Sequence, residues 1–423
     1  MPLSREKTVS RWPLASRLLV ALCVVLLGLE LVLQFVPGLV PRPYRETFAA
    51  NGLGFERPEL LEETPVRALP LPLSVQTYTG PPPSDLVGYL GVAPDTARAI
   101  DAARWPEVHL PIDARGLPNP TVPARADVLL VGDSFAVAAG CTQPVSLQAL
   151  LEREFGLDVY NLGVTGTGPL QQRWILRTEG LPKSPRVVVW LFFGGNDLTD
   201  TSGTLQLERQ GLVTWGDRFS DGLRPRWILP DLVGYLFERE VRAEAESPAE
   251  PFAFPASDGS TVPMWFAPKY LMGLTFPRAK IERLPAWSSI LEALEGARDE
   301  CDAAGARFLC VYVPSKAQVH LPLVEPNAAL AFRTANADFD SPLYTEATLL
   351  PAALEHRGVL ETLVREACED RAIPFVSATP ALEGLARSGT LGYLTADTHW
   401  SPDGQAAFLP ELAAAIEELF AAD

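Results

Sequence analysis

A serine that follows a wholly apolar run is the feature that most constrains the fold of this chain. Four consecutive large apolar residues begin at Val128, and Gly132, Asp133 and Ser134 follow them directly. Such a run is typical of a strand covered on both faces, and glycine allows a sharp turn at its end. The alanine-rich residues after Ser134 favour a helix. We therefore expect Ser134 at a helix N-terminus, where unpaired N–H groups favour an anion.

Alternating strand and helix patterns after Val128 predict an α/β fold. The predicted strands cover residues 128–131, 157–162, 186–193, 307–313 and 372–376, and the predicted helices cover residues 145–155, 169–179, 290–304 and 359–368. Repeated βα units form a mostly parallel sheet with helices on both faces. Ligands bind such sheets outside the carboxyl ends of the strands, where Ser134 is the candidate nucleophile.

A base and a carboxylate for this serine lie near the C-terminus. Serine is a weak nucleophile unless a neighbouring base removes its proton. His399 supplies a group whose unperturbed pKa is close to the working pH, and Asp397 precedes it by two residues. His399 is therefore the candidate general base, and Asp397 is the candidate carboxylate that orients its ring. For the other histidines a position without a catalytic role is the better interpretation: His109, His320 and His356.

Four sequence blocks in this order resemble the SGNH (GDSL-type) hydrolase family. They are Gly132-Asp133-Ser134, Asn161 to Gly166, Phe193 to Asp197, and Asp397 to His399. The resemblance implies a flavodoxin-like three-layer α/β/α domain with a catalytic triad of Ser134, Asp397 and His399. It also implies an oxyanion hole formed by the N–H groups of Ser134 and Gly166 and the side chain of Asn196.

One departure from the family pattern leaves the reaction open. Most members space the carboxylate and the histidine as Asp-x-x-His, whereas this chain has Asp397-x-His399 followed by Trp400. The shorter spacing is similar to that of alginate-type O-acetyltransferases, although in those enzymes the serine block follows the Asp-His block. The similarity to that branch is therefore local.

Three functions are consistent with these blocks. The first is a serine esterase that cleaves a small acyl ester, such as an acetyl ester, of a carbohydrate or lipid through an acyl-enzyme. The second is an O-acetyltransferase that modifies an exported or cell-envelope polysaccharide with the help of a membrane-bound acyl-donor partner. The third is a catalytically silent envelope protein with the same fold. The enzyme class expected first is a hydrolase acting on ester bonds.

An apolar run near the N-terminus predicts a membrane anchor. Residues 18–36 would span roughly 28 Å as a helix, close to the hydrocarbon thickness of a bilayer, and basic residues precede them in residues 1–17. A basic flank stays in the cytoplasm, so we expect a single-pass protein with its catalytic domain in the periplasm or at the cell surface. A cleaved signal peptide is the alternative, but no Ala-x-Ala site directly follows the run.

Composition predicts the remaining boundaries. Residues 37–125 are rich in proline and weak in helical periodicity, which is typical of an extended connector or a small subdomain. Its last part, Asp113 to Pro120, is expected to pack beside a hydrolase domain of residues 126–423. Two stretches interrupt the βα alternation and are predicted insertions: residues 200–285 and residues 321–350. The first either shapes the cleft or is a solvated addition.

The net charge and the cysteine content limit the kinds of partner and cofactor that the chain could bind. The formal net charge of -17 argues against nucleic acid, because phosphate binding needs clustered cations. The five cysteines and four histidines show no metal-ligand spacing, so we expect neither a metal nor another cofactor. Most of the cysteines are expected to be buried apolar residues. A bridge between Cys301 and Cys310 is the alternative in an oxidising compartment.

Overall fold

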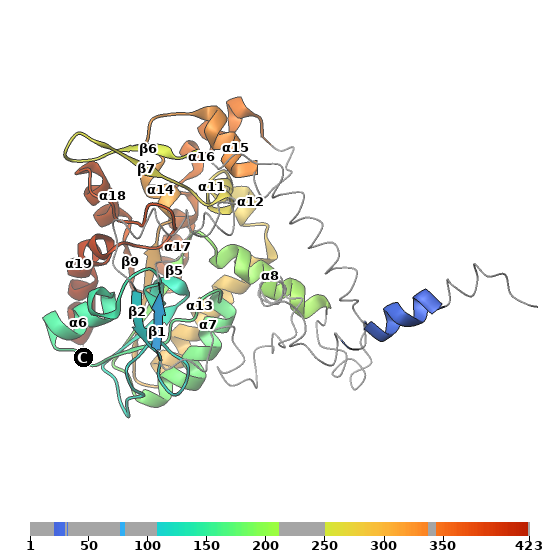
Figure 1. Ribbon diagram of the computed structural model, residues 1–423. Coiled ribbons are helices and arrows are strands. Elements are labelled where there is room, and N and C mark those ends of the chain that lie inside the picture. The colour runs from blue at the N-terminus through green and yellow to red at the C-terminus, as the bar shows by residue number, and fades with distance from the viewer. Residues whose placement is uncertain are drawn as a thin grey trace, which may run out of the picture. The chain divides into compact units, whose positions relative to one another are not determined.

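The computed structural model describes residues 21–29, 32, 77–80, 108–210, 250–336 and 344–421. The described residues contain a five-stranded parallel sheet in the order β4-β3-β5-β8-β9. Figure 1 shows helices around this sheet, with β5 and β9 labelled. The strands are β3 (Val128–Gly132), β4 (Val159–Asn161), β5 (Val187–Phe193), β8 (Arg307–Val313) and β9 (Phe375–Ser377). Counted along the chain this is the 2-1-3-4-5 order of flavodoxin-like folds. The predicted α/β fold with a mostly parallel sheet is confirmed.

The sequence of β5 shows why both faces of the sheet are covered. Each side chain from Val187 to Phe193 is at most 1% exposed. Side chains alternate along a strand, so odd-numbered residues such as Val189 join one apolar cluster and even-numbered residues such as Trp190 join the other. Full burial of one such side chain contributes roughly 1.5–3 kcal/mol to folding, so both layers of helices stabilise this strand.

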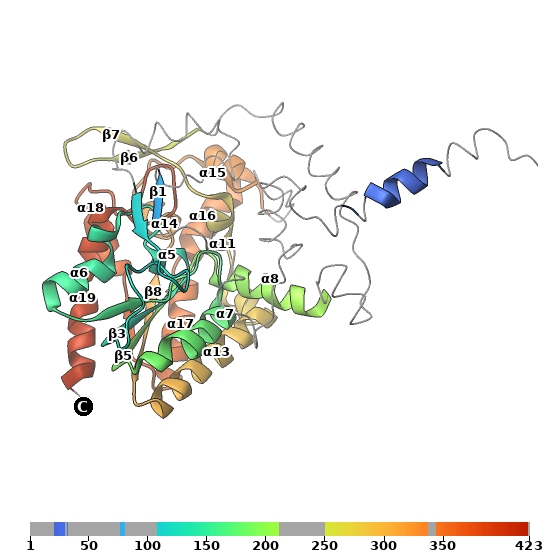
Figure 2. The ribbon, with the colours of Figure 1, turned by 60° about the horizontal axis from the view of Figure 1, so that its bottom comes forward.

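Two layers of helices supply these clusters. Helices α6 (Leu147–Phe155) and α19 (Pro402–Ala421) pack on one face, and α7 (Pro169–Ile175), α13 (Pro285–Ala303) and α17 (Val359–Asp370) pack on the other. Figure 2 shows the two layers on opposite sides of β3, β5 and β8. Helix α7 runs into a π-helical turn, Leu176–Gly180, and a 3-10 turn, Leu181–Lys183, while α8 (Asp197–Gln210) follows β5.

Further elements add to the core on the side of α6 and α19. They are β6 (Phe252–Pro255), β7 (Thr261–Met264), α11 (Pro268–Gly273), α14 (Lys316–His320), α15 (Ala328–Asn336), α16 (Glu346–His356) and α18 (Thr379–Arg387), and α12 (Arg278–Ile281) precedes α13. Phe252, Phe254 and Met264 of the β6–β7 hairpin are at most 2% exposed. Residues 250–285 of the first predicted insertion therefore extend the hydrophobic core. Residues 211–249 of that insertion lie outside the described residues.

The end of the predicted connector packs against the edge of the sheet. Strands β1 (Thr77–Gly80) and β2 (Val108–Pro111) pair antiparallel. Beyond them the side chain of Asn119 donates to the carbonyl of Asn161 at 2.8 Å and accepts from its N–H at 2.8 Å. The hydroxyl of Tyr160 donates to Asp113 at 3.0 Å. The two bonds of Asn119 satisfy backbone groups at the end of β4.

Only part of the predicted N-terminal anchor is described. Residues 21–29 form a helix with exposed side chains, among them Leu22 and Val25. In the described part of the chain, no helix combines the length and the apolar character that a membrane crossing requires. Most other residues of the predicted 18–36 segment, and all of residues 1–17, lie outside the described residues.

The four cysteines after residue 107 are buried thiols. Cys141, Cys301, Cys310 and Cys368 are each at most 1% exposed and unbridged. The alternative of a bond between Cys301 and Cys310 is therefore wrong. Burial raises the pKa of Cys301 to about 12, with the neighbouring Asp302 acting in the same direction, so this thiol is unreactive at neutral pH.

Candidate active site

Ser134 lies where the sequence pattern predicts it, directly after a buried strand. Strand β3 ends at Gly132, and Ser134 begins the single turn α5 (Ser134–Val137), shorter than the helix the alanines suggest. Asp133 caps that turn by accepting from the N–H of Phe135 at 2.9 Å. A Cβ on Gly132 would lie 3.0 Å from the carbonyl oxygen of Leu191 in the neighbouring strand. The tight turn beside β5 therefore requires glycine.

The structure brings Ser134, His399 and Asp397 into one hydrogen-bonded row. The Nε2 atom of His399 lies 2.7 Å from the Oγ atom of Ser134, and its Nδ1 atom lies 2.5 Å from Oδ1 of Asp397. The same carboxylate oxygen accepts the backbone N–H of His399 at 2.9 Å. Two bonds to one oxygen fix both the backbone and the ring of the histidine, so the short Asp-x-His spacing still orients the imidazole toward Ser134.

The environment of Asp397 favours its ionised form. The residue is 2% exposed, and burial by itself would raise its pKa. The adjacent His399, through charge and hydrogen bonds, and the charge of Lys316 outweigh burial and hold the pKa of Asp397 below its usual value. A charged carboxylate is the form that accepts the Nδ1–H proton of a neutral histidine and stabilises an imidazolium.

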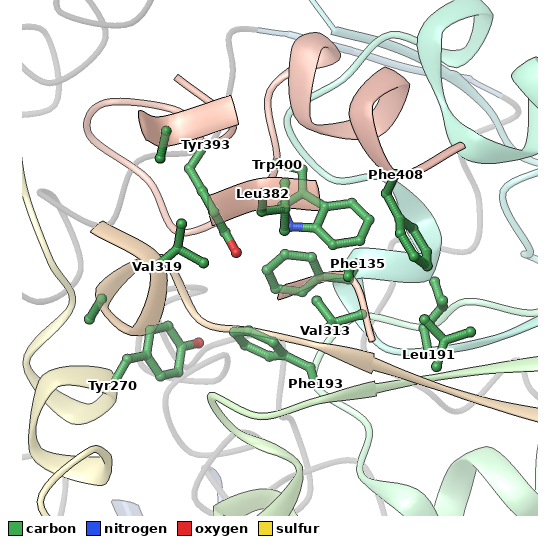
Figure 3. Close-up of a cluster of buried hydrophobic side chains, with 14 of the residues drawn as sticks. Phe135, Leu191, Phe193, Tyr270, Val313, Val319, Leu382, Tyr393, Trp400 and Phe408 are labelled. Atoms are coloured by element: carbon green, nitrogen blue, oxygen red, sulfur yellow. The ribbon is translucent and has the colours of Figure 1, made fainter. Parts of the chain in front are cut away.

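Aromatic packing holds the serine turn and the histidine loop together. The ring of Phe135 lies 4.1 Å from the ring of Phe193, 5.1 Å from that of His399 and 5.6 Å from that of Trp400, measured between centroids. Figure 3 shows Phe135 between Trp400 and Phe193. The thiol of Cys141 also donates to the carbonyl of Trp400 at 3.3 Å. Residues distant in sequence therefore position Ser134 and His399 against each other.

The three predicted oxyanion donors follow three adjacent strands. Ser134 follows β3, Gly166 follows β4 and Asn196 follows β5, and β3 lies between the other two. Gly166 is exposed with φ of +75°, and a Cβ there would meet no atom of the described residues within 4 Å. Asn196 is 7% exposed, and within the described part of the chain its Oδ1 has no hydrogen-bond partner. All three therefore lie at the carboxyl ends of the strands, at the point where the strand order reverses.

Gly163 has a packing role distinct from Gly166. A Cβ on Gly163 would lie 2.5 Å from the backbone N of Val137 and 2.8 Å from the carbonyl carbon of Ala136. The side chain of Asn161 donates to the carbonyl of Ala136 at 2.6 Å and accepts from the N–H of Gly163 at 2.8 Å. This block therefore supports the turn that carries Ser134, while Gly166 remains open to solvent.

Three carboxyl groups follow strands β3 and β5 at this end of the sheet: Asp133 and Asp197 are fully buried, and Asp200 is half-buried. Burial raises the pKa of Asp133, although the N–H of Phe135 and the charge of His399 oppose it. Asp197 accepts from the N–H of Phe193 at 2.8 Å, and burial with the charge of Asp133 raises its pKa well above the usual value. Burial raises the pKa of Asp200 to about 7, opposed by Lys269 and aided by Asp133. Within the described residues no such cluster could hold a metal ion.

A comparison with protein families assigns this arrangement. Residues 130–407 match the GDSL-like lipase/acylhydrolase family. The chain belongs to this family. The predicted resemblance and the predicted class, a hydrolase acting on ester bonds, are thereby confirmed. The matched residues include Ser134, Gly166, Asn196, Asp397 and His399.

Solved structures of low identity are also similar to this GDSL-like acylhydrolase. An extracellular lipase from Streptomyces rimosus is 14% identical, with 69% of this chain and 99% of that chain covered and a TM-score of 0.36. A phospholipase A1 from Streptomyces albidoflavus is 12% identical, with 69% and 100% covered and a TM-score of 0.36. An acetyl-xylooligosaccharide esterase from Geobacillus is 14% identical, with 70% and 95% covered and a TM-score of 0.33. No curated protein matches the chain.

Proposed function

We propose that this GDSL-like acylhydrolase is a membrane-anchored, extracytoplasmic serine esterase that removes a small acyl group, such as acetate, from a carbohydrate or lipid. The observation that carries the proposal is the 2.7 Å separation between Ser134 Oγ and His399 Nε2, with Asp397 on the other ring nitrogen. A serine, a base and an orienting carboxylate in this geometry are what acyl transfer through an acyl-enzyme requires.

The reaction follows from the protonation states. The carboxylate of Asp397 accepts the Nδ1–H of a neutral His399, so Nε2 carries no proton and accepts the hydroxyl proton of Ser134. The serine oxygen then attacks the ester carbonyl, and the negative charge that develops is stabilised by the N–H groups of Ser134 and Gly166 and by the amide of Asn196. The imidazolium protonates the departing alcohol. Water, activated by the same histidine, releases the acyl group from the serine.

O-acetyltransfer is the second candidate. It is supported by the Asp397-x-His399-Trp400 spacing and by the apolar N-terminal run, which would bring the domain to a membrane-bound acyl donor. In this reaction a sugar hydroxyl replaces water in the second step. A donor ester mixed with an oligosaccharide distinguishes the two reactions by mass spectrometry, because transfer yields acetylated sugar and hydrolysis yields only free acetate.

Catalytic silence is the third candidate, and the close contacts of the triad favour an active site over it. A fluorophosphonate probe tests this directly, since it labels a serine only where a base activates it. We expect labelling of the parent protein and none of the Ser134→Ala variant. Absence of labelling in a folded parent protein would support a silent scaffold.

The membrane location is part of the proposal. It rests on the apolar run of residues 18–36, on the basic residues before it and on the exposed apolar side chains of the helix at residues 21–29. Fusion of a periplasm-active reporter to the C-terminus, followed by extraction with salt and with detergent, tests it. We expect an active reporter that only detergent releases. An inactive reporter or release by salt alone would contradict the proposed location.

A further inference from the structure

A buried lysine lies beside the triad and belongs to none of the four family blocks. Lys316 is the first residue of α14 and follows β8 by three residues. It is 2% exposed, and its ammonium group donates to the carbonyl of Thr395 at 2.8 Å and to the carbonyl of Asp397 at 2.8 Å. The ammonium thus binds the backbone on the two sides of Ala396, and one of its two partners is the backbone carbonyl of Asp397.

Such burial is costly for a charged group unless hydrogen bonds and an opposite charge compensate for it. Lysine is mostly exposed in folded proteins, because its flexible stem allows the charge to reach water. Here the carbonyl groups of the histidine loop replace water, and the carboxylate of Asp397 supplies the opposite charge. Titratable groups that interact with Lys316 include Asp397, whose pKa its charge lowers, and His320, whose pKa burial and then Lys316 lower to about 3.

The same segment holds the loop at a second point. The hydroxyl of Tyr393 donates to the carbonyl of Pro314 at 2.7 Å. The carbonyl of Thr395, bound by Lys316, also accepts the N–H of Trp265 at 3.1 Å, which is contributed by the chain just after β7. Lys316 after β8 and Trp265 after the β6–β7 hairpin therefore both bind the carbonyl of Thr395. Thr395 belongs to the histidine loop, the residues from Tyr393 to His399.

We propose that Lys316 is a positioning residue of this hydrolase, whose ammonium group fixes the backbone from Thr395 to Asp397 and thereby holds the carboxylate against the ring of His399. This inference rests on the proposed triad of Ser134, His399 and Asp397. Through its hydrogen bonds to the carbonyls of Thr395 and Asp397, Lys316 is linked to the backbone of the histidine loop. It acts through Asp397, because a carboxylate held in place and kept ionised maintains the tautomer in which Nε2 accepts the serine proton.

The test compares Lys316→Met, which keeps the length of the side chain without its charge, with Lys316→Arg, which keeps the charge. Lys183→Met is the matched control, because Lys183 precedes β5 at the opposite end of the strand from the site. Hydrolysis of a short-chain aryl ester is measured against pH, and the concentration of active sites is determined by fluorophosphonate labelling. The kcat per labelled serine then excludes any contribution from unfolded protein.

We expect Lys316→Met to lower kcat per active site by about 10- to 100-fold with little change in KM, as for a small misplacement of catalytic groups. The acid limb of its pH–rate profile moves to higher pH, because removal of a positive charge near the imidazole favours the imidazolium. Lys316→Arg restores part of the loss, and Lys183→Met behaves as the parent. In an Asp397→Asn background Lys316→Met has little further effect, since both changes remove the same function.

A proton resonance gives a readout that needs no turnover. The Nδ1–H proton shared by His399 and Asp397 across 2.5 Å is expected far downfield in the proton NMR spectrum of the parent. In Lys316→Met it shifts or broadens. If kcat per active site, the pH profile and this resonance all match the parent while Ser134→Ala is inactive, the inference about Lys316 is wrong and the proposed function stands. If Ser134→Ala retains the parent activity, the proposed function itself fails.

Discussion

The ring of Phe135 packs against the ring of His399, with centroids 5.1 Å apart, although 263 residues lie between them in the sequence. Phe135 directly follows the proposed nucleophile Ser134, so the residue after this serine packs against the proposed general base. The same ring also contacts Phe193 at the end of β5. The apolar position after the serine is thus a structural connection between the two parts of the proposed triad.

Substitution of Phe135 tests this connection. Phe135→Ala creates a cavity at a residue that is 2% exposed, so we expect a loss of about 3–5 kcal/mol in unfolding free energy and a marked loss of activity. Phe135→Leu introduces the residue of the usual GDSL pattern and leaves a smaller cavity than Phe135→Ala, so it should cost less. Urea denaturation and ester hydrolysis measure both. Equal behaviour of the two variants would contradict a packing role.

Asn196→Ala tests the oxyanion site. Removal of one such donor typically lowers kcat by about 10²–10³-fold, and KM should change little because the interaction forms with the transition state. Gly166→Ala retains the backbone N–H that donates, so we expect a smaller effect from strain at its φ of +75°. Steady-state kinetics separate kcat from KM. A loss in Asn196→Ala confined to KM would argue against transition-state stabilisation.

Gly163→Ala tests the support under the serine turn. The added Cβ would lie 2.5 Å from the backbone N of Val137, so the turn has to move, and both stability and activity should fall. Gly203→Ala in α8 is the matched control, because a Cβ there would meet no atom of the described residues within 4 Å. It should be neutral or more stable by roughly 0.5–1 kcal/mol, since alanine favours a helix. Melting temperatures of the two variants, followed by circular dichroism, check this difference.

Asp200 predicts a particular dependence of stability on pH. Its pKa is raised to about 7 in the folded chain, chiefly by burial, whereas an unfolded aspartate titrates near 3.8. The folded state binds more protons between these values, so this residue lowers stability as pH rises from about 4 to 7. Asp200→Asn removes that effect, and its stability relative to the parent should increase over this window and then level off. A constant difference from pH 4 to pH 8 would contradict the raised pKa.

The strands, and the three residues Ser134, His399 and Asp397 that the structure brings together, could be predicted because their sequence signals are local. The apolar run at Val128 and the run ending at Phe193 each have one favourable conformation, and β3 and β5 form there. The last strand begins later than predicted, at Phe375, because Pro374 has no N–H to donate and contributes only its carbonyl, to the N–H of Cys310. Short strands such as β6 and β7 in the insertion carry too little pattern to be recognised.

The residues that the sequence did not indicate act through distant partners. In the sequence, Lys316 has the pattern of a solvent-exposed lysine after a strand. Its burial depends on the carbonyl groups of Thr395 and Asp397, which follow it by 79 and 81 positions in the chain. The raised pKa of Asp200 likewise depends on burial and on Asp133, which reaches it only through the fold. Neither relationship is visible in local spacing, because both arise where loops from different strands meet.

The most direct test of the account is the reactivity of one oxygen, Ser134 Oγ, which lies 2.7 Å from Nε2 of His399. The parent protein, Ser134→Ala and His399→Ala are each incubated with a fluorophosphonate probe and then assayed with a short-chain aryl ester. We predict stoichiometric labelling of the parent at Ser134, and neither labelling nor ester hydrolysis by the two folded variants above the buffer rate. Hydrolysis by Ser134→Ala at the parent rate would contradict the central claim.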